Sequence, residues 1–302
     1  CTMQFFYRIF YHPLVNRLVR NTFSLLGNAL PQKLRIPISG PVKLQISPEG
    51  HQIRLRTNPT NSMAKLVYWS ETHNHEYTDL FIRLLPQVSV FMDIGASIGY
   101  YSIVGKTLKD DLIVHAFEPA DGPFHYLQQN FRDNAFREAV AHNIAISDQE
   151  GKLSFYAPFN AKYRFLKHHL GGDGSLQNRP ENNHLKEITV QTRTLDQMVD
   201  ELQLDRIDLM KLDTESTEDQ VLMGGAKSIH RFRPIIISEV LYNKIETKLD
   251  AILTDWDYLI YRHRDGQGLE LISQLARNED DGASNFFFVP KEKQAFFEEV
   301  MI

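Results

Sequence analysis

Four acidic residues lie at the ends of apolar stretches, a pattern that could bind a polar ligand. They are Asp93, Glu118, Asp213 and Glu239, and the stretch before each one has the composition of a buried β-strand. Strands that are apolar on both faces are typical of parallel sheets covered by helices. Ligands bind at the carboxyl ends of strands in open parallel sheets, and burying unpaired carboxylates is costly. The four acids are therefore candidate site residues.

A glycine turn follows the first of these acids, in the stretch "VFMDIGASIGYYS" of residues 90–102. Gly95 and Gly99 allow a ligand to approach the backbone, and helical spacing begins directly afterwards. A dinucleotide fingerprint would need two further glycines where Ser97 and Tyr100 stand, which weakens a nicotinamide interpretation. The pattern D-x-G-x-x-x-G resembles the first motif of class I methyltransferases that use S-adenosylmethionine (SAM). The glycines could also serve only close helix–strand packing.

The second acid, Glu118, lies 25 residues after the first and directly before Pro119. At this spacing, α/β nucleotide sites place a carboxylate that accepts hydrogen bonds from the ribose hydroxyls. A surface acid at a strand end is the alternative. The apolar stretch of residues 139–147 predicts a third strand, and its end near Ala145 could form one wall of an adenine slot.

Alternating strand and helix patterns from residue 70 onward predict an α/β domain over residues 70–302. Helices are expected over residues 71–87 and 217–232. Residues 41–56 alternate in polarity around "SPEG", which predicts a β-hairpin within an N-terminal extension of residues 1–69. Residues 5–30 are amphipathic and basic around Pro13. They could lie on an anionic membrane surface, although packing on the domain itself or on a second subunit of a homo-oligomer is favoured.

Composition limits the classes of partner. The 302 residues carry a net charge of -5, which argues against nucleic acid as the main partner. Cys1 is the only cysteine, which suits a reducing compartment, and we expect a cytoplasmic location. No apolar run is long enough to predict a transmembrane helix.

A long polar segment, residues 158–186, is expected to be a lid over the acceptor site. It contains His168, His169 and His184. Histidines in a polar loop rarely bind a metal ion without carboxylate or thiolate partners at fixed spacing, so a metal site there is disfavoured.

Taken together, the motifs resemble the FkbM family of SAM-dependent methyltransferases over residues 88–290. The matching stretches are "FMDIGASIGYYS", "HAFEP", "NIAISDQEGKLSF", "TRTLDQMV", "IDLMKLDTESTEDQVLMGG", "PIIISEV" and "NFFFVP". The resemblance implies a Rossmann-like fold with a mostly parallel seven-stranded sheet and helices on both faces. It also implies SAM as cofactor and methylation of a hydroxyl on a sugar, glycan or secondary metabolite. Two departures are Ser97, where the family usually has Asn, and Ser216, where it usually has Gly.

Carried onto this chain, the resemblance assigns cofactor contacts from one end of the ligand to the other. Asp213 would face the cofactor amine or the acceptor. The methionine end would contact Asp93, Gly95, Ala96, Ser97 and Gly99. The ribose would contact Glu118, and the adenine side would contact Asn143 to Ala145.

A hydroxyl is a poor nucleophile, so a general base is expected. The candidates are Asp213, Glu215 and Glu239, with His168 or His169 if the loop closes. The sequence "DTES" lacks the N-P-P-Y type motif of enzymes that methylate base nitrogens, which disfavours a nitrogen acceptor. No metal is predicted, although the same three acids could hold a divalent ion. A nicotinamide-dependent oxidoreductase and a non-catalytic SAM-binding protein are the alternative functions.

Overall fold

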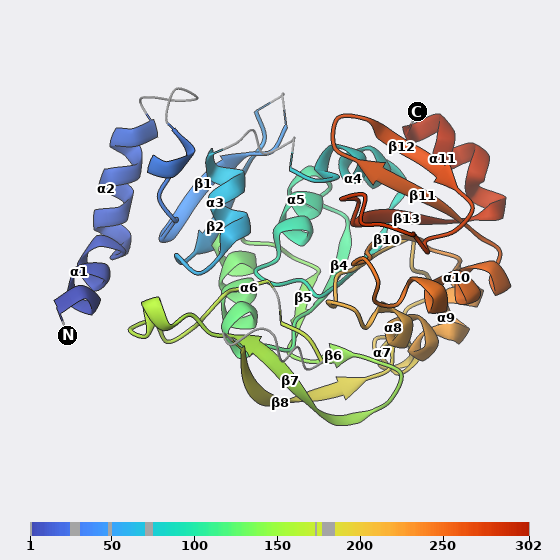
Figure 1. Cartoon of the computed structure of the whole chain (residues 1–302). Coiled ribbons are helices and arrows are strands. Elements are labelled where there is room, and N and C mark those ends of the chain that lie inside the picture. Colours follow the sequence, from blue (N-terminus) through green and yellow to red (C-terminus); the bar gives the residue numbers. More distant parts are fainter. Residues whose placement is uncertain are drawn as a thin grey trace.

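The computed structural model describes residues 2–24, 31–47, 50–69, 75–172, 174–176 and 185–301 (Figure 1). His184, one of the three histidines of the long loop, lies outside these ranges. A sheet of eight strands occupies the centre, in the order β12-β11-β13-β10-β9-β3-β4-β5. Its strands are β3 (Val90–Ile94), β4 (Ile113–Phe117), β5 (Ala139–His142), β9 (Leu209–Leu212), β10 (Ile235–Glu239), β11 (Tyr258–Arg264), β12 (Gly268–Ile272) and β13 (Asn285–Pro290).

The pairing of these strands is the one expected of a class I methyltransferase fold. β5, β4, β3, β9 and β10 are parallel neighbours, and β13 runs antiparallel between β10 and β11. The predicted α/β fold with a mostly parallel sheet is therefore confirmed. The predicted count of seven strands is wrong by one, because β11 turns back through residues 265–267 into β12, which pairs with it as an edge hairpin.

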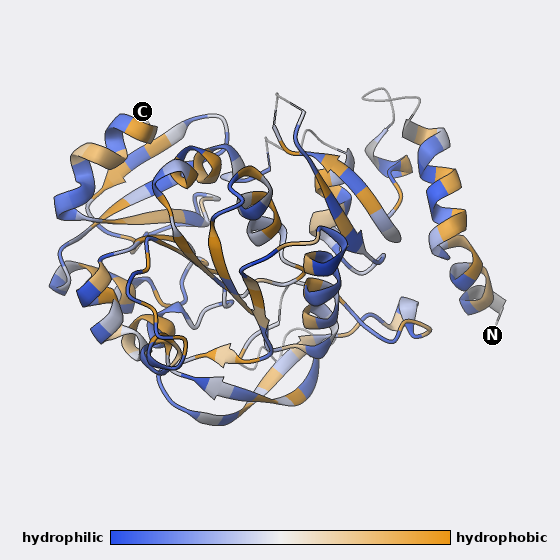
Figure 2. Ribbon diagram, turned by 180° about the vertical axis from the view of Figure 1, so that it is seen from behind, coloured by the Kyte–Doolittle hydropathy of each residue, from blue (hydrophilic) through white to orange (hydrophobic). Residues whose placement is uncertain are grey.

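Helices cover both faces of the sheet and enclose two apolar cores. One core lies against helices α4, α5, α6 and α11, and the other against α7, α8, α9 and α10. Figure 2 shows hydrophobic residues along the central strands, which are buried on both faces. The helices of the domain are α4 (Thr78–Leu84), α5 (Tyr100–Leu108), α6 (Asp121–Asp133), α7 (Leu195–Glu201), α8 (Glu218–Gly224), α9 (Ala226–Phe232), α10 (Glu246–Asp255) and α11 (Gln294–Met301).

The third predicted strand, residues 139–147, is two strands in different sheets. β5 ends at His142, and β6 (Ala145–Ile146) pairs with β8 (Leu185–Arg193), which also pairs with β7 (Gly151–Pro158) in a separate three-stranded sheet. Asn143 causes the break, because its amide donates hydrogen bonds to the carbonyls of Glu118 and Pro119, each at 3.0 Å. These bonds hold the chain at the end of the neighbouring strand.

Two predicted helices are shorter than expected. The helix expected over residues 71–87 is α4 followed by one 3-10 turn, and residues 70–74 lie outside the description. The helix expected over residues 217–232 is interrupted at Gly225. A Cβ there would lie 2.5 Å from Leu195 Cδ2, so glycine allows α7 to pack closely at the break.

The N-terminal extension has the predicted hairpin, formed by β1 (Gly40–Gln45) and β2 (Gln52–Thr57). The remaining helices of the extension are α1 (Thr2–Phe10), α2 (Pro13–Ser24) and α3 (Ser62–Trp69). The hairpin packs against α6, where Arg56 forms an ion pair with Asp133 at 2.7 Å. Its apolar face belongs to the same core as α4 and α5. The division at residue 70 stays a prediction. Within the described ranges, no helix has the length and apolar character needed to cross a membrane.

Candidate active site

The carboxyl ends of β3, β4, β9 and β10 border two adjoining cavities with about 680 Å³ and about 1010 Å³ of empty space. Both are lined by Gly95, Ser97, Gly172 and Asp213, so they form one continuous cleft. Glu118 and Ala145 line the first cavity, which is here named the inner cavity. The second, here named the outer cavity, is lined by Asp93, Ala96, Glu215 and Glu239 among others.

The two glycines after β3 have different tasks. Gly95 has φ of +77°, and a Cβ there would lie 1.9 Å from the carbonyl oxygen of Asp213. This glycine therefore brings the β3 turn against the end of β9, inside the cleft. Gly99 has φ of +87°, and its Cβ would lie 2.4 Å from Leu127 Cδ1 of α6. Gly99 lines neither cavity, and its lack of a Cβ allows α5 to pack closely against α6; its predicted contact with the cofactor stays a prediction.

Glu118 is buried, at 7% exposed, and is anchored through both carboxylate oxygens. Oε2 accepts the backbone N–H of Ser97 at 2.9 Å, and Oε1 accepts that of Ala120 at 2.8 Å. Burial raises the pKa of Glu118 to about 7, although the two N–H donors oppose the shift. Each carboxylate oxygen keeps a second lone pair, so the group can accept further hydrogen bonds from a ligand in the inner cavity.

Of the residues predicted for the adenine side, Ala145 lines the inner cavity and Asn143 does not. Ala145 lines the inner cavity together with Ile144 and Ile146. Asn143 does not line either cavity, because its amide is engaged with the backbone of Glu118 and Pro119. It positions the strand end that carries Glu118.

A buried lysine, Lys211 on β9, was missed by sequence reasoning. Its ammonium lies 3.2 Å from Asp213 Oδ2 and 3.6 Å from Asp93 Oδ1, and it donates a hydrogen bond to the carbonyl of Gly95 at 3.0 Å. Burial would lower the pKa of Lys211, but the nearby charges of Asp213 and Asp93 outweigh burial and raise it. Asp93 also accepts a hydrogen bond from Ser102 Oγ at 2.6 Å. The signal was present in the sequence, as one lysine inside the apolar stretch "LMKL".

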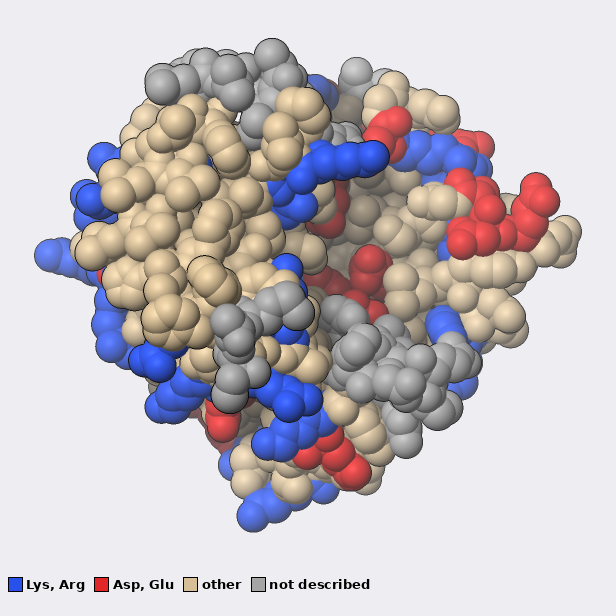
Figure 3. Space-filling view, turned by 60° about the vertical axis from the view of Figure 1, so that its left-hand side comes forward, with Lys and Arg blue, Asp and Glu red and all other residues tan. Residues whose placement is uncertain are grey.

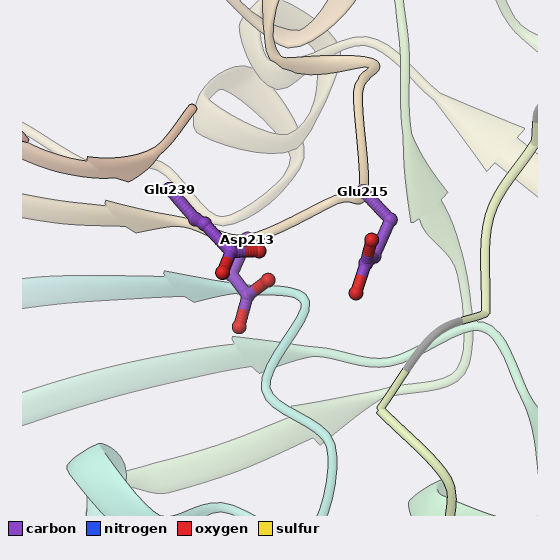
Figure 4. Close-up of side chains that lie close together, drawn as sticks. All are labelled: Asp213, Glu215 and Glu239. Atoms are coloured by element: carbon purple, nitrogen blue, oxygen red, sulfur yellow. The ribbon is translucent and has the colours of Figure 1, made fainter. Parts of the chain in front are cut away.

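The three acids named as candidate bases line the outer cavity together. One carboxylate oxygen from each of Asp213, Glu215 and Glu239 lies within 4.8 Å of the others. Figure 4 shows Asp213 and Glu239 at neighbouring strand ends, with Glu215 reaching toward the same space from the following loop. Burial and the charges of Asp213 and Glu215 raise the pKa of Glu239 to about 9. The raised pKa favours the protonated form of Glu239, which can donate a hydrogen bond.

The loop that carries Glu215 has an unusual backbone. Glu215 has φ of +58° and Ser216 has φ of +79°, a region in which glycine is favoured. Ser216 thus adopts a conformation that favours glycine, the residue that the family resemblance led us to expect at this position. Ser175 Oγ donates a hydrogen bond to the carbonyl of Glu215 at 2.8 Å, which ties this turn to the long loop.

The loop histidines lie away from the acids. The ring of His168 stacks on His125 of α6 at 4.5 Å between centroids, and His169 Nδ1 accepts the backbone N–H of Asn160 at 3.1 Å. Neither lines the inner or the outer cavity. The structure therefore does not bring these two candidate bases to the acids. The loop instead contributes small residues to the cleft, among them Gly171, Gly172 and Gly174.

Further lining residues of the outer cavity escaped the sequence analysis, among them His75, Glu76, Tyr100 and Tyr101. The hydroxyl of Tyr101 donates a hydrogen bond to Glu76 Oε2 at 3.0 Å, and Tyr100 Oη lies 3.3 Å from Thr78 Oγ1. Burial raises the pKa of Tyr100 to about 12. Because His75 and Glu76 precede α4, no sequence pattern connected them with the strand ends.

A family model described as the methyltransferase FkbM domain matches residues 93–262. The 31-O-demethyl-FK506 methyltransferase FkbM of Streptomyces tacrolimicus is 31% identical over 166 residues, which are 47% of this chain and 61% of that protein. The 2-O-methyltransferase NoeI of Sinorhizobium fredii is 28% identical over 153 residues, 48% of this chain and 60% of that protein. The chain thus spans about 60% of the length of these two relatives.

Among solved structures, methyltransferase FkbM from Methylobacillus flagellatus KT matches with a TM-score of 0.43 and 16% identity. The match covers 67% of this chain and 43% of that one. The family match covers more than half of the chain and includes the glycine turn, Glu118 and the three converging acids. SAM is the cofactor of this family. The chain belongs to the FkbM family of methyltransferases.

Proposed function

We propose that the chain transfers a methyl group from SAM to a hydroxyl oxygen, with Glu215 as the general base. The observation that carries this proposal is the meeting of three carboxylates in the outer cavity, directly beside the cavity that holds Glu118. A carboxylate in this cavity can accept the proton that an acceptor hydroxyl must lose when it is methylated.

The residues of the inner cavity fit the cofactor. Gly95 and Ser97 line this cavity at the turn after β3, and the Glu118 carboxylate can accept hydrogen bonds from two neighbouring hydroxyls of a ribose. Ala145 and Ile146 supply an apolar wall for an adenine ring. Asp213, held by Lys211, can accept a hydrogen bond from the amine of the methionine part. When bound, SAM supplies an electrophilic methyl group on a sulfonium.

Among the three acids, Glu215 suits the role of base best. Burial and the neighbouring acids raise the pKa of Glu239, which favours its protonated form and suits it to donate a hydrogen bond to the acceptor. Asp213 is paired with the Lys211 ammonium at 3.2 Å. The acceptor hydroxyl would pass its proton to the Glu215 carboxylate while its oxygen bonds to the methyl carbon; the bond from that carbon to sulfur would break, and its electron pair would leave with the thioether S-adenosylhomocysteine.

The outer cavity suits an acceptor with several hydroxyl groups. Its wall combines polar side chains from different parts of the chain with an aromatic surface. Ser62 and His75 can offer hydrogen bonds, and Tyr100 and Tyr101 are the aromatic residues of the lining. The names of the two relatives describe O-methylation, one at the 31-O position of FK506 and one at a 2-O position. We therefore propose a sugar, a glycan or a hydroxylated secondary metabolite as acceptor.

Methyl-labelled SAM and a panel of sugars, glycans, polyketides and amines test this proposal. We expect label on a hydroxyl oxygen of at least one acceptor and none on the amines. With that acceptor, Glu215→Gln should lower kcat about 100-fold or more, the usual contribution of a general base. Glu299→Gln on the exposed face of α11 is the matched control and should retain full activity.

The alternatives give different results in the same experiment. Label on nitrogen alone would contradict the proposed acceptor class. Full activity of Glu215→Gln would contradict the proposed base. SAM binding without transfer to any member of a broad panel would support a non-catalytic SAM-binding protein, and tight NAD binding would support an oxidoreductase.

A further inference from the structure

Two N-terminal helices, α1 and α2, present large apolar side chains to solvent. Leu18 is 67% exposed and Phe6 is 63% exposed, although both residues lie in well-formed helices. The exposed apolar residues of these helices, here named the N-terminal apolar face, are Phe5, Phe6, Ile9, Phe10, Leu14 and Leu18. Six large apolar side chains in two consecutive helices form a patch, rather than the scattered single residues that are normal on a protein surface.

Helix α2 buries polar side chains and exposes apolar ones, the reverse of an ordinary surface helix. Its buried face carries polar side chains, because Asn16 and Arg20 are 0% and 3% exposed. Arg20 donates hydrogen bonds to the carbonyls of Ser39 and Pro41, and Asn16 accepts the N–H of Ser39. Leu14 and Leu18 consequently point outward. A surface helix normally places its apolar stripe toward the core, so this helix is built for an apolar environment outside the chain.

Charge identifies the kind of surface that this face fits. Residues 1–48 contain no Asp or Glu, although the whole chain has a net charge of -5. The same segment holds six basic residues, and Arg8 and Arg17 are exposed among the apolar side chains. Figure 3 shows a broad uncharged surface at the left with lysine and arginine around it. Apolar side chains flanked by basic ones are typical of helices that lie in the interface of an anionic bilayer.

We propose that α1 and α2 dock the protein on an anionic membrane surface. The apolar residues would enter the headgroup region, and Arg8 and Arg17 would contact lipid phosphates. A second copy of the chain is a poorer occupant, because a two-fold contact through this face would bring the exposed arginines of both copies together. The proposal does not depend on the methyl acceptor or on SAM binding.

Docking would also place the cleft beside the membrane. α1 contacts the long loop, because Gln4 Nε2 donates to the carbonyls of Ala161 and Lys162, and Lys162 Nζ lies 4.8 Å from the ring centroid of Tyr7. The same loop lines the cleft at Gly172. Figure 3 shows a hollow with acidic side chains next to the uncharged surface, on the same side of the molecule.

Co-sedimentation with lipid vesicles tests the proposal. The full chain is mixed with vesicles of phosphatidylcholine alone or of phosphatidylcholine with phosphatidylglycerol, at low and high salt. We expect binding to the anionic vesicles, weaker binding at high salt, and little binding to phosphatidylcholine. Leu14→Gln with Leu18→Gln, and separately Arg8→Gln with Arg17→Gln, should each lower the partition coefficient about tenfold or more.

Matched variants on other faces separate docking from general effects. Met223→Gln with Leu271→Gln removes comparably exposed apolar residues, and Lys152→Gln with Lys227→Gln removes exposed charges; both should leave binding unchanged. Unaltered thermal unfolding would show that all variants fold. Absence of binding to anionic vesicles, or equal binding by the N-terminal variants, would overturn the proposal. So would a dimer of the parent chain in sedimentation equilibrium that the Leu14 and Leu18 variant abolishes, since the face would then be an interface between copies.

Discussion

Replacement of Lys211 by Met should destabilise the fold strongly, because it leaves buried carboxylates without their cation. The Lys211 ammonium lies 3.6 Å from Asp93 and 3.2 Å from Asp213, and the side chain of Asp93 is only 1% exposed. Removing one partner of a buried ion pair costs about 3–5 kcal/mol. The side chain of Asp213 is 37% exposed, so water screens its charge when the lysine is lost. Most of the electrostatic cost therefore comes from Asp93. We expect a loss of about 3 kcal/mol in the free energy of unfolding.

Urea unfolding near neutral pH, followed by tryptophan fluorescence, measures this loss. Lys211 has a raised pKa, so its charge and its stabilising effect are present throughout the neutral range and would be lost only in strong alkali. Adding Asp93→Asn to Lys211→Met should restore about half of the loss or more, because the uncompensated charge is then removed. Lys106→Met is the matched control: this buried lysine donates to the carbonyl of Asp110, so its removal leaves a neutral group behind.

Two results would refute this reasoning about Lys211. A loss below about 1 kcal/mol would mean that water or a rearranged side chain compensates Asp93. A double variant whose loss equals the sum of the two single losses would mean that Lys211 and Asp93 are not coupled.

Three other predictions concern the acids of the cleft. Glu118→Gln should weaken SAM binding about tenfold or more in calorimetry while the fold survives, since charge-assisted hydrogen bonds contribute about 1.5–3 kcal/mol each; unchanged affinity would make Glu118 a structural acid only. Glu239 has a pKa of about 9, above the ordinary value of 4.5, so it reduces stability as pH rises between these values. Glu239→Gln should therefore raise Tm by several degrees near pH 9 and leave it unchanged near pH 5, and an equal effect at both would contradict the raised pKa. EDTA should leave methyl transfer within about twofold, because the Lys211 ammonium already lies beside Asp213; loss of activity restored by Mg²⁺ would show that the three acids hold a metal ion.

The sequence pattern predicted the central sheet well, because burial on both faces leaves an unmistakable apolar run. Strands β3, β4, β9 and β10 lie where such runs end in an acid. The same signal failed at residues 139–147. The apolar pattern continues through this stretch, but the side chain of Asn143 bonds to the backbone of the neighbouring strand end and separates β5 from β6. A tertiary contact of this kind leaves no local pattern in the sequence.

The sequence could anticipate which acids lie near one another where strand order alone brings them together. Asp213 and Glu239 end adjacent parallel strands, so their convergence follows from the topology. Gly99 and His168 were less predictable. Whether a glycine faces a ligand or a helix depends on what packs above it, and the contact of Gly99 is Leu127. The position of His168 depends on a stacking contact with His125 on α6, which lies outside the loop.

A crystal structure with S-adenosylhomocysteine would show whether the inner cavity binds the cofactor. The quantity to measure is the separation between the Glu118 carboxylate oxygens and the ribose hydroxyls. We expect hydrogen bonds of about 2.5–3.0 Å there, with the sulfur directed toward the outer cavity and its acids Asp213, Glu215 and Glu239. A ligand bound outside the inner cavity, or a ribose without contact to Glu118, would contradict this expectation.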